Sequence, residues 1–447
     1  MPAENQHERV CHGQPWRPNG WRQVPLSAVA QVQFSSVDKR TEGGEKPVRL
    51  CNYTDVYNNE YITADMEFMR ATATPPEIHR FGLRVGDVII TKDSETPNDI
   101  GVSAVVDSTA DDLVCGYHLA LLRPDTDQVD PTFLAKQLRQ HRVARYFGQQ
   151  ANGSTRYGLS RASIASAPVC MPRLSDQRRA VATLRLTDRA IAKTKDVIAK
   201  LQHVRQGLLD DLLTRGTDSQ GTVRDARSAS AFFAGTPLGP RPRSWSVQTV
   251  DELATQVTDG EHQTPARTAD GIFLLSARNV LDGRLALDDV DHISEQEYER
   301  ISRRCRPEPG DILISCSGTV GRICAVPEGF RCSLVRSVAI IKLRQQVMLP
   351  RFAEMAMQHT SVQRQIASGK RQLAQGNLFQ SEIRQLLVPV PPLAEQEMIV
   401  SRVTVIDRVF EQEREELDSL LMVKRGLSND LLGCSASDEG DSAHAQD

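Results

Sequence analysis

The stretch PPLAEQEMIVSRVTVIDRVFEQEREELDSLLMVKRGLSNDLL, residues 391–432, decides the fold of this chain. Its apolar residues recur at alternating intervals of four and three. They are Ile399, Val403, Ile406, Phe410, Leu417, Leu420, Leu427 and Leu431, with Glu413 and Lys424 in the two remaining positions. This is the a/d pattern of a heptad repeat, and it predicts a long helix that packs along another helix.

The partner helix is expected in the same chain, at an offset of 219 residues, as between Ala180 and Ile399. The equivalent positions keep the spacing without a gap: Ala180, Leu184, Thr187, Ile191, Thr194, Ile198, Leu201, Arg205, Leu208 and Leu212. Residues outside the seam repeat as well, since Gln177 matches Gln396 and Gly207 matches Gly426. Registers that agree over this length predict an internal duplication.

The flanking charges of the two helices are complementary. The first helix is basic, at Arg178, Arg179, Arg185, Arg189, Lys193, Lys195 and Lys200, and the second is acidic, at Glu411, Glu413, Glu415, Glu416 and Asp418. Such charges favour pairing of the two helices and fix their register. The alternative is two separately solvated helix faces.

These residues carry a family resemblance. The run LVPVPPLAEQ, the long helix and KRGLSNDLL resemble the central and distal regions of type I restriction-modification specificity subunits, and APVCMPRLSDQ through VRQGLLDDLL is similar. The resemblance implies that each copy is a globular target-recognition domain followed by a long helix. It also implies that this subunit selects the DNA sequence, while separate subunits methylate and cleave.

We therefore expect an α+β chain with two target-recognition domains, each followed by a long helix, and with the two helices paired as an intramolecular antiparallel coiled coil. The expected parts are a leader (1–20), domain 1 (21–170), the central helix (171–216), a linker (217–242), domain 2 (243–390), the distal helix (391–432) and a disordered tail (433–447). The motif at Gly86-Asp87 recurs at Gly310-Asp311, which supports two homologous domains. The offset differs by five residues there, and we assign that change to the loop after the strand in domain 1.

Composition restricts the class of protein. The 447 residues contain 40% hydrophobic and 25% charged residues, which is ordinary for a globular protein. The sequence contains no run of ~20 apolar residues and no signal-peptide core, so we expect a cytoplasmic protein without a membrane segment. The nine cysteines are interpreted as reduced thiols, and the group at Cys305, Cys316, Cys324 and Cys332 as strand packing rather than a zinc site. The net charge of −3 does not by itself indicate a nucleic-acid binder.

Catalytic motifs are missing from the sequence. Neither an NPPY-type adenine loop nor a GxxxxGK[ST] phosphate loop occurs, and the ten histidines show no metal spacing. We therefore expect a non-catalytic binding subunit without a cofactor of its own. By resemblance, S-adenosylmethionine, ATP and Mg belong to partner subunits. The implied partners are double-stranded DNA, two methyltransferase subunits and, through that core, endonuclease-translocase subunits, with no membrane.

Candidate DNA contacts are polar and basic loop side chains, which can reach base edges or phosphates. In domain 1 they are Lys39, Arg40, Tyr57, Asn58, Lys92, Ser94, Asn152, Ser154, Thr155 and Arg156. In domain 2 they are Thr258, His262, Thr264, Arg267, Ser315, Ser317, Thr319, Arg322, Lys370, Arg371, Gln372 and Gln375. For each residue, ordinary loop solvation is the alternative. For Asp259 a plain Asp-Gly turn is the favoured interpretation, and for His118 and His262 structural roles are favoured.

The two recognition domains differ in sequence, so the resemblance implies a bipartite DNA target with two different half-sites. Two alternatives belong to other classes of protein. One is a coiled-coil scaffold without sequence readout, and the other is a fused DNA methyltransferase or nuclease with degenerate motifs. Methyl transfer by the isolated chain would favour the enzyme.

Overall fold

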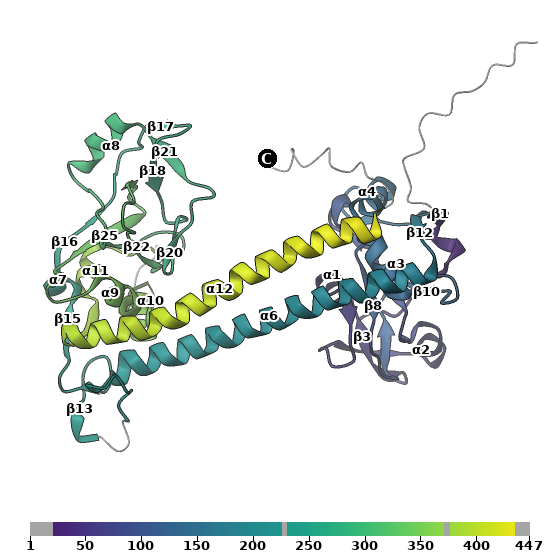
Figure 1. Ribbon diagram of the computed structural model, residues 1–447, viewed down its shortest axis with the longest axis horizontal. Coiled ribbons are helices and arrows are strands. Elements are labelled where there is room, and N and C mark those ends of the chain that lie inside the picture. Colours follow the sequence, from purple (N-terminus) through teal and green to yellow (C-terminus); the bar gives the residue numbers. More distant parts are fainter. Residues whose placement is uncertain (1–20, 226–229, 371–375, 434–447) are drawn as a thin grey trace, which may run out of the picture. The chain divides into compact units, whose positions relative to one another are not determined.

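The computed structural model describes residues 21–225, 230–370 and 376–433 (Figure 1). The chain divides into two compact units. Unit 1 contains the described residues up to Thr194 together with those from Glu416 onward, and unit 2 is Lys195–Glu415. Each of the two long helices therefore contributes one part to each unit.

The long helices α6 (Leu174–Arg215) and α12 (Leu393–Leu432) agree with the helices predicted from the heptads. Every seam position named above is buried or half-buried, including the polar positions Thr194 and Lys424. The helix α6 ends at Arg215, and the next residue, Gly216, has a φ of 65°, in the left-handed region that glycine adopts readily.

Unit 1 is built on a five-stranded sheet and a three-stranded sheet. The first has the order β2 (Ala30–Phe34), β10 (Leu119–Pro124), β6 (Val88–Thr91), β8 (Ser103–Val106), β4 (Tyr61–Ile62). The second has the order β5 (Met69–Ala73), β3 (Lys46–Cys51), β9 (Leu113–Cys115). The pairs β1 (Arg22–Pro25) with β12 (Pro168–Met171) and β7 (Asp93–Ser94) with β11 (Tyr157–Gly158) complete the strands. The shorter helices are α1 (Tyr53–Asn58), α2 (Pro75–Phe81), α3 (Pro131–Leu138), α4 (His141–Gln150) and α5 (Arg161–Ala165).

Unit 2 has two four-stranded sheets. One has the order β16 (Ala254–Asp259), β25 (Val338–Leu343), β22 (Ile312–Ser315), β23 (Ile323–Ala325). The other has the order β17 (Arg267–Thr268), β21 (Asp291–Ile293), β18 (Ile272–Leu275), β24 (Cys332–Leu334). Two-stranded pairs are β13 (Phe233–Ala234) with β14 (Arg241–Pro242), β15 (Ser246–Thr249) with β26 (Leu387–Val390), and β19 (Val280–Leu281) with β20 (Arg284–Leu285). The shorter helices are α7 (Val250–Leu253), α8 (Glu295–Ser302), α9 (Pro350–Gln358), α10 (Thr360–Lys370) and α11 (Gln380–Gln385).

The duplication is visible in both units. The strand order β2-β10-β6-β8 of unit 1 recurs as β16-β25-β22-β23 in unit 2. The joint between domain and long helix is repeated atom for atom. The Gln177 side chain accepts from Asp130 N (2.9 Å) and donates to the carbonyls of Gln128 and Pro172. The Gln396 side chain accepts from Leu349 N (2.8 Å) and donates to the carbonyls of Val347 and Pro391, each 219 residues further on.

The two helices also make contacts within each unit. In unit 1, Leu427, Leu431 and Leu432 of α12 share an apolar cluster with Ala180 and Leu184 of α6. In unit 2, Leu209 and Leu212 of α6 belong to the same apolar core as Ile399 and Val403 of α12. The start of α6 therefore packs with the end of α12 in one unit, and the end of α6 packs with the start of α12 in the other.

Three details differ from, or add to, the expectations. The segment after Asp130 forms two helices, α3 and α4, with a break before His141. The expectation of reduced thiols is wrong for Cys170, which is disulfide-bonded, because composition does not reveal which distant cysteines meet. The group at Cys305, Cys316, Cys324 and Cys332 consists of free, buried thiols in the apolar cores, as predicted.

Within the described ranges, no three His, Cys, Asp or Glu side chains come together as a metal site. Over the same residues, no helix has the length and apolar character needed to cross a membrane.

Candidate nucleic-acid interface

Unit 1 gathers candidate loops at one edge of its larger sheet. Phe34 of β2 pairs with Ala120 of β10, which pairs with Ile90 of β6. The loop after β2, the loop after β6 and the loop before β10 therefore leave the sheet at the same edge. Residues 39–40, 92–94 and 117–118, which are distant in sequence, become neighbours there.

A cavity of about 650 Å³ at this edge brings together Ser94, Asn152 and Arg156. The pairing of β7 with β11 holds the two contributing loops side by side. A smaller cavity of about 220 Å³ is lined by Lys39 and Arg40. The imidazole of His118 lines both cavities, so the two sets of candidates are adjacent.

Tyr57 belongs to the same region. Its hydroxyl donates to Asp99, a residue of the larger cavity, and its ring stacks on Tyr53 at 5.5 Å. The hydrogen bond to Asp99 raises the pKa of Tyr57, so this hydroxyl stays protonated. The remaining candidates Asn58, Ser154 and Thr155 are exposed to solvent.

Lys92 and Ser94 are buried rather than presented on a loop surface. The Lys92 ammonium pairs with Asp93 at 3.1 Å and lies 4.4 Å from the centre of the Tyr117 ring. The structure therefore gives Lys92 the role of a support for the loop that carries Tyr117 and His118.

Sequence reasoning missed Tyr117 as a candidate and favoured a structural role for His118. Tyr117 is half exposed and packs edge-on against His118, whose Nδ1 lies 3.0 Å from Asp93. An exposed aromatic residue directly before a buried strand is the sequence signal that could have identified them.

Unit 2 repeats this arrangement. Asp259 of β16 pairs with Ala339 of β25, which pairs with Ile314 of β22. The loops after β16 and after β22 therefore leave at a common edge. The first carries His262 and Thr264 and the second carries Ser317, Thr319 and Arg322, of which His262, Thr264 and Thr319 are exposed.

Several members of the domain 2 set hold these loops in shape. The buried Ser315 hydroxyl donates to the carbonyl of Thr319 and accepts from Arg322 N. Asp259 lies 2.9 Å from His262 Nε2 and accepts from Arg304. The Asp-Gly turn thus carries a side chain that organises the loop after β16.

The other domain 2 candidates differ in their placement. Thr258 is half-buried in β16, and Arg267 pairs with Asp291 at 3.0 Å. Lys370 is the last residue of α10. Arg371, Gln372 and Gln375 lie outside the described residues.

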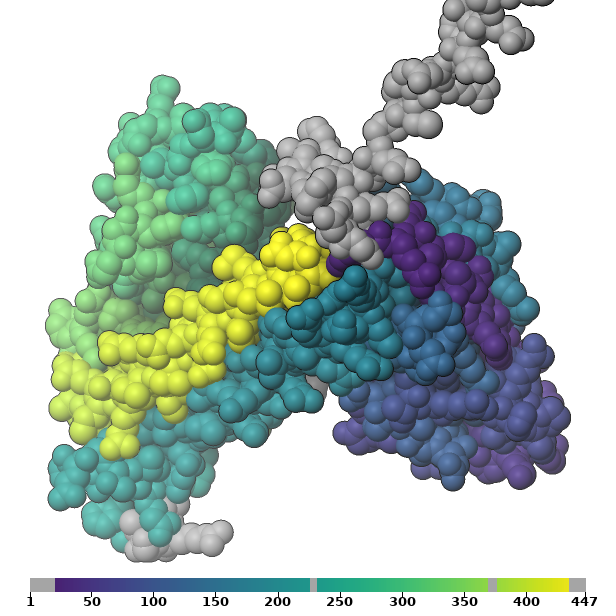
Figure 2. Space-filling model, turned by 45° about the vertical axis from the view of Figure 1, so that its right-hand side comes forward, coloured from purple at the N-terminus to yellow at the C-terminus, as the bar shows by residue number. Residues whose placement is uncertain are grey.

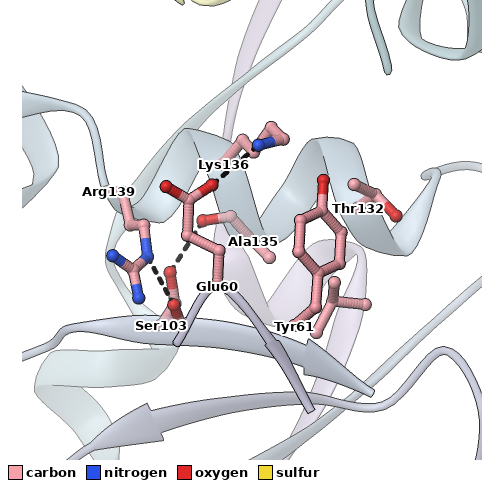
Figure 3. A pocket seen from close by; sticks show the side chains of 8 residues that line it. Glu60, Tyr61, Ser103, Thr132, Ala135, Lys136 and Arg139 are labelled. Atoms are coloured by element: carbon pink, nitrogen blue, oxygen red, sulfur yellow. Dashed lines mark hydrogen bonds and ion pairs between the residues drawn. The ribbon is translucent and has the colours of Figure 1, made fainter. Parts of the chain in front are cut away.

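A cluster of four charges in unit 1 joins the recognition domain to both long helices. The Lys136 ammonium of α3 lies 2.8 Å from Glu60 and 2.6 Å from Asp188 of α6. The Lys424 ammonium of α12 lies 2.5 Å from Glu60 and 2.7 Å from Asp188. Figure 3 shows Lys136, Glu60 and Tyr61 around a hollow that has no room for a water molecule. We therefore interpret this cluster as a structural joint and not as a ligand site.

The pKa values of the cluster follow from this geometry. Burial opposes ionisation of Asp188, but hydrogen bonds from Lys136 and Lys424 outweigh it, and the pKa of Asp188 lies below its ordinary value. Burial and the same two ammonium groups leave the pKa of Glu60 lowered as well. Burial opposes the charge on Lys424, yet Glu60 and Asp188 raise its pKa overall. Glu60, Asp188 and Lys424 are therefore held in their charged forms at neutral pH.

Comparison with known proteins supplies the family. The family model of the type I restriction modification DNA specificity domain matches residues 286–421. The chain is 22% identical over 367 residues, 80% of each protein, to the "Putative type I restriction enzyme MjaX specificity subunit" of Methanocaldococcus jannaschii. It is 25% identical over 194 residues to the type I restriction enzyme EcoBI specificity subunit of Escherichia coli, covering 43% of this chain and 41% of that protein.

Solved structures agree on the fold. The type I restriction-modification S subunit from M. genitalium superimposes with a TM-score of 0.57 at 14% identity, covering 95% of this chain and 98% of that one. A chain from a study of complex assembly and conformational transition of the type I R-M system gives a TM-score of 0.54 at 16% identity, over 93% and 98%. The fold and loop clusters define a duplicated α+β protein with a long C-terminal helix. The family model, the curated relatives and the solved structures all indicate a type I restriction-modification specificity subunit.

Proposed function

We propose that this chain is the non-catalytic subunit that reads DNA sequence for a type I restriction-modification complex in the cytoplasm. The observation that carries the proposal is the equivalent placement of loops in both units. In each unit, loops with different side chains leave the same edge of the same sheet. Two related readers on one chain suit a target with two different half-sites.

The two long helices are proposed to pair as one antiparallel coiled coil. The Asp188–Lys424 ion pair in unit 1 and the Arg205–Asp407 ion pair in unit 2 support this, because both fit a single antiparallel register. The 219-residue offset relates the two pairs, since Asp188 corresponds to Asp407 and Arg205 corresponds to Lys424. The helix that supplies the acid in one pair therefore supplies the base in the other.

Two methyltransferase subunits are proposed to dock on equivalent apolar positions of the helices. In unit 1, Leu186 and Val423 are 67% and 52% exposed and lie near the Asp188–Lys424 ion pair in their helices. In unit 2, the equivalent residues Val405 and Val204 are 58% and 57% exposed and lie near the Arg205–Asp407 ion pair. The surface of α12, in yellow, is open on the face seen in Figure 2. Exposed apolar side chains that recur with the duplication suit two copies of one partner.

The endonuclease-translocase subunits would join this core, and S-adenosylmethionine, ATP and Mg would be bound by the partner subunits. The chain itself would then contribute binding and positioning. We expect the purified chain to neither methylate nor cut DNA, and to support site-specific methylation once its methyltransferase partner and S-adenosylmethionine are added.

Exchange of residues 21–167 for the matching domain of a relative tests the two-reader proposal. Sequencing of methylated bases on DNA treated with the reconstituted complex should show one altered half-site and one unaltered half-site. The matched control exchanges the equivalent part of domain 2 and should alter the other half-site. If either exchange changed both half-sites or neither, the proposal would be wrong.

A further inference from the structure

Unit 2 contains a cavity of about 620 Å³ away from the candidate DNA loops. It lies between the end of α6, the hairpin of β13 and β14, and the start of α10, and none of the candidate DNA contacts lines it. The lining combines an apolar wall, formed by Phe233, Leu238 and Pro240, with the side chains of Arg215, Arg241, Arg364 and His359.

Arg241 is the feature of this cavity that calls for a ligand. The residue is 3% exposed, its Nη1 donates to the carbonyl of Pro240, and its buried Nε has no partner in the described chain. Burial lowers the pKa of Arg241, and among the described residues no carboxylate opposes that effect. A buried guanidinium without an anion is unfavourable, so a bound anion would stabilise it.

A second guanidinium, that of Arg364, lies near the same place. Arg241 and Arg364 both act electrostatically on His359, which places the three groups near one another. Thr360 and Ser361 line the cavity at the N-terminal end of α10, where a helix favours anions. The two carboxylates of the lining are already engaged, since Asp210 pairs with His359 at 3.1 Å and Asp211 pairs with Arg215.

We propose that this cavity binds a small organic phosphate of mononucleotide size. The phosphate lies between Arg241 and Arg364 at the start of α10, and the apolar body lies against Phe233 and Leu238. The volume falls within the range of small-molecule sites. Arginine guanidinium groups and a helix N-terminus are the usual recognition elements for phosphate. This site is separate from the DNA-reading edge of unit 2.

Calorimetric titration of the full chain with AMP, inorganic phosphate and adenosine tests the assignment. We expect saturable binding of AMP, weaker binding of inorganic phosphate and none of adenosine. Arg364 is exposed, so Arg364→Gln should keep the fold, and it should weaken AMP binding about tenfold or more because a charged hydrogen bond is lost. Arg303→Gln is the matched control, because Arg303 is exposed in the same unit but does not line the cavity.

Three results would overturn the proposal: no saturable AMP binding, equal binding of adenosine, or an unchanged affinity in Arg364→Gln. Inorganic phosphate binding as tightly as AMP would remove the role of the apolar wall. If a short DNA duplex displaced AMP and lost affinity in Arg364→Gln, the site would belong to a DNA phosphate instead. Thermal unfolding of each variant provides the check on folding.

Discussion

Replacing Asp188 by asparagine should destabilise unit 1 strongly. Asp188 faces both Lys136 and Lys424 within 2.7 Å and accepts from the Tyr61 hydroxyl. Its side chain is 11% exposed and that of Lys136 is 7% exposed, so water cannot replace the lost charge. The amide of asparagine keeps the size of the side chain but leaves two ammonium groups to share Glu60.

The magnitude follows from the geometry of the cluster. Removing one partner from a buried ion pair costs roughly 3–5 kcal/mol, and we expect the lower end because Glu60 remains and Lys424 is about one-quarter exposed. A loss of about 3 kcal/mol in a domain of this size lowers Tm by roughly 6–12 °C. Lys424→Met should cost less, because Lys424 is more exposed than Asp188 and Lys136 still pairs with both carboxylates.

Hydrogen–deuterium exchange followed by mass spectrometry can locate this effect. Peptides covering 180–191 and 420–432 should exchange faster in Asp188→Asn, while peptides of unit 2 should not change. Asp196→Asn, at an exposed position on the same helix, is the matched control. An Asp188→Asn variant with the Tm and exchange pattern of Asp196→Asn would refute the reasoning, since the cluster would then contribute nothing measurable.

Three further predictions concern the joints and the seam. Gln177→Ala and Gln396→Ala should each cost about 3 kcal/mol in thermal unfolding, because each leaves three buried or partly buried backbone groups without a partner; a large difference between the two would contradict equivalent joints. The lowered pKa values of Glu60 and Asp188 mean that their contribution to stability is complete above their ordinary values of 4.5 and 3.8 and is lost as the pH falls through the lowered folded values. The Tm deficit of Asp188→Asn should therefore shrink toward pH 3, and a deficit independent of pH would argue against an ionic cause. Inserting two residues after Gly207 turns the following seam by about 200° and should abolish the fold of unit 2 by circular dichroism, whereas four residues, about one turn, should be tolerated better.

The long helices could be predicted because their information is local. A heptad needs only residues three and four apart, and the seam from Ala180 to Leu212 is buried or half-buried as the spacing requires. The duplication was visible for the same reason, since a fixed offset survives in the linear sequence. The break between α3 and α4 was missed because Leu138 and His141 interrupt no apolar periodicity.

The candidate site was only partly predictable because its contacts are long-range. The sheet edge where the loops meet depends on the register of three strands, and that register cannot be inferred from the sequence of any one strand. Lys92 looked like a free cation in sequence, but Asp93 and the Tyr117 ring enclose it. The cluster of four charges comes from four separate segments of the chain, so no local pattern could predict it.

The matched glutamine joints have a consequence for how the gene can change. The codons of Gln177 and Gln396 encode the same residue at the same place in two long helices, 219 residues apart. A crossover between them removes one domain and one helix, yet it preserves the reading frame, the heptad register and one complete joint. The inherited unit is therefore a domain with its helix, and a new specificity can spread by exchange of that unit without redesign of the residues that hold it.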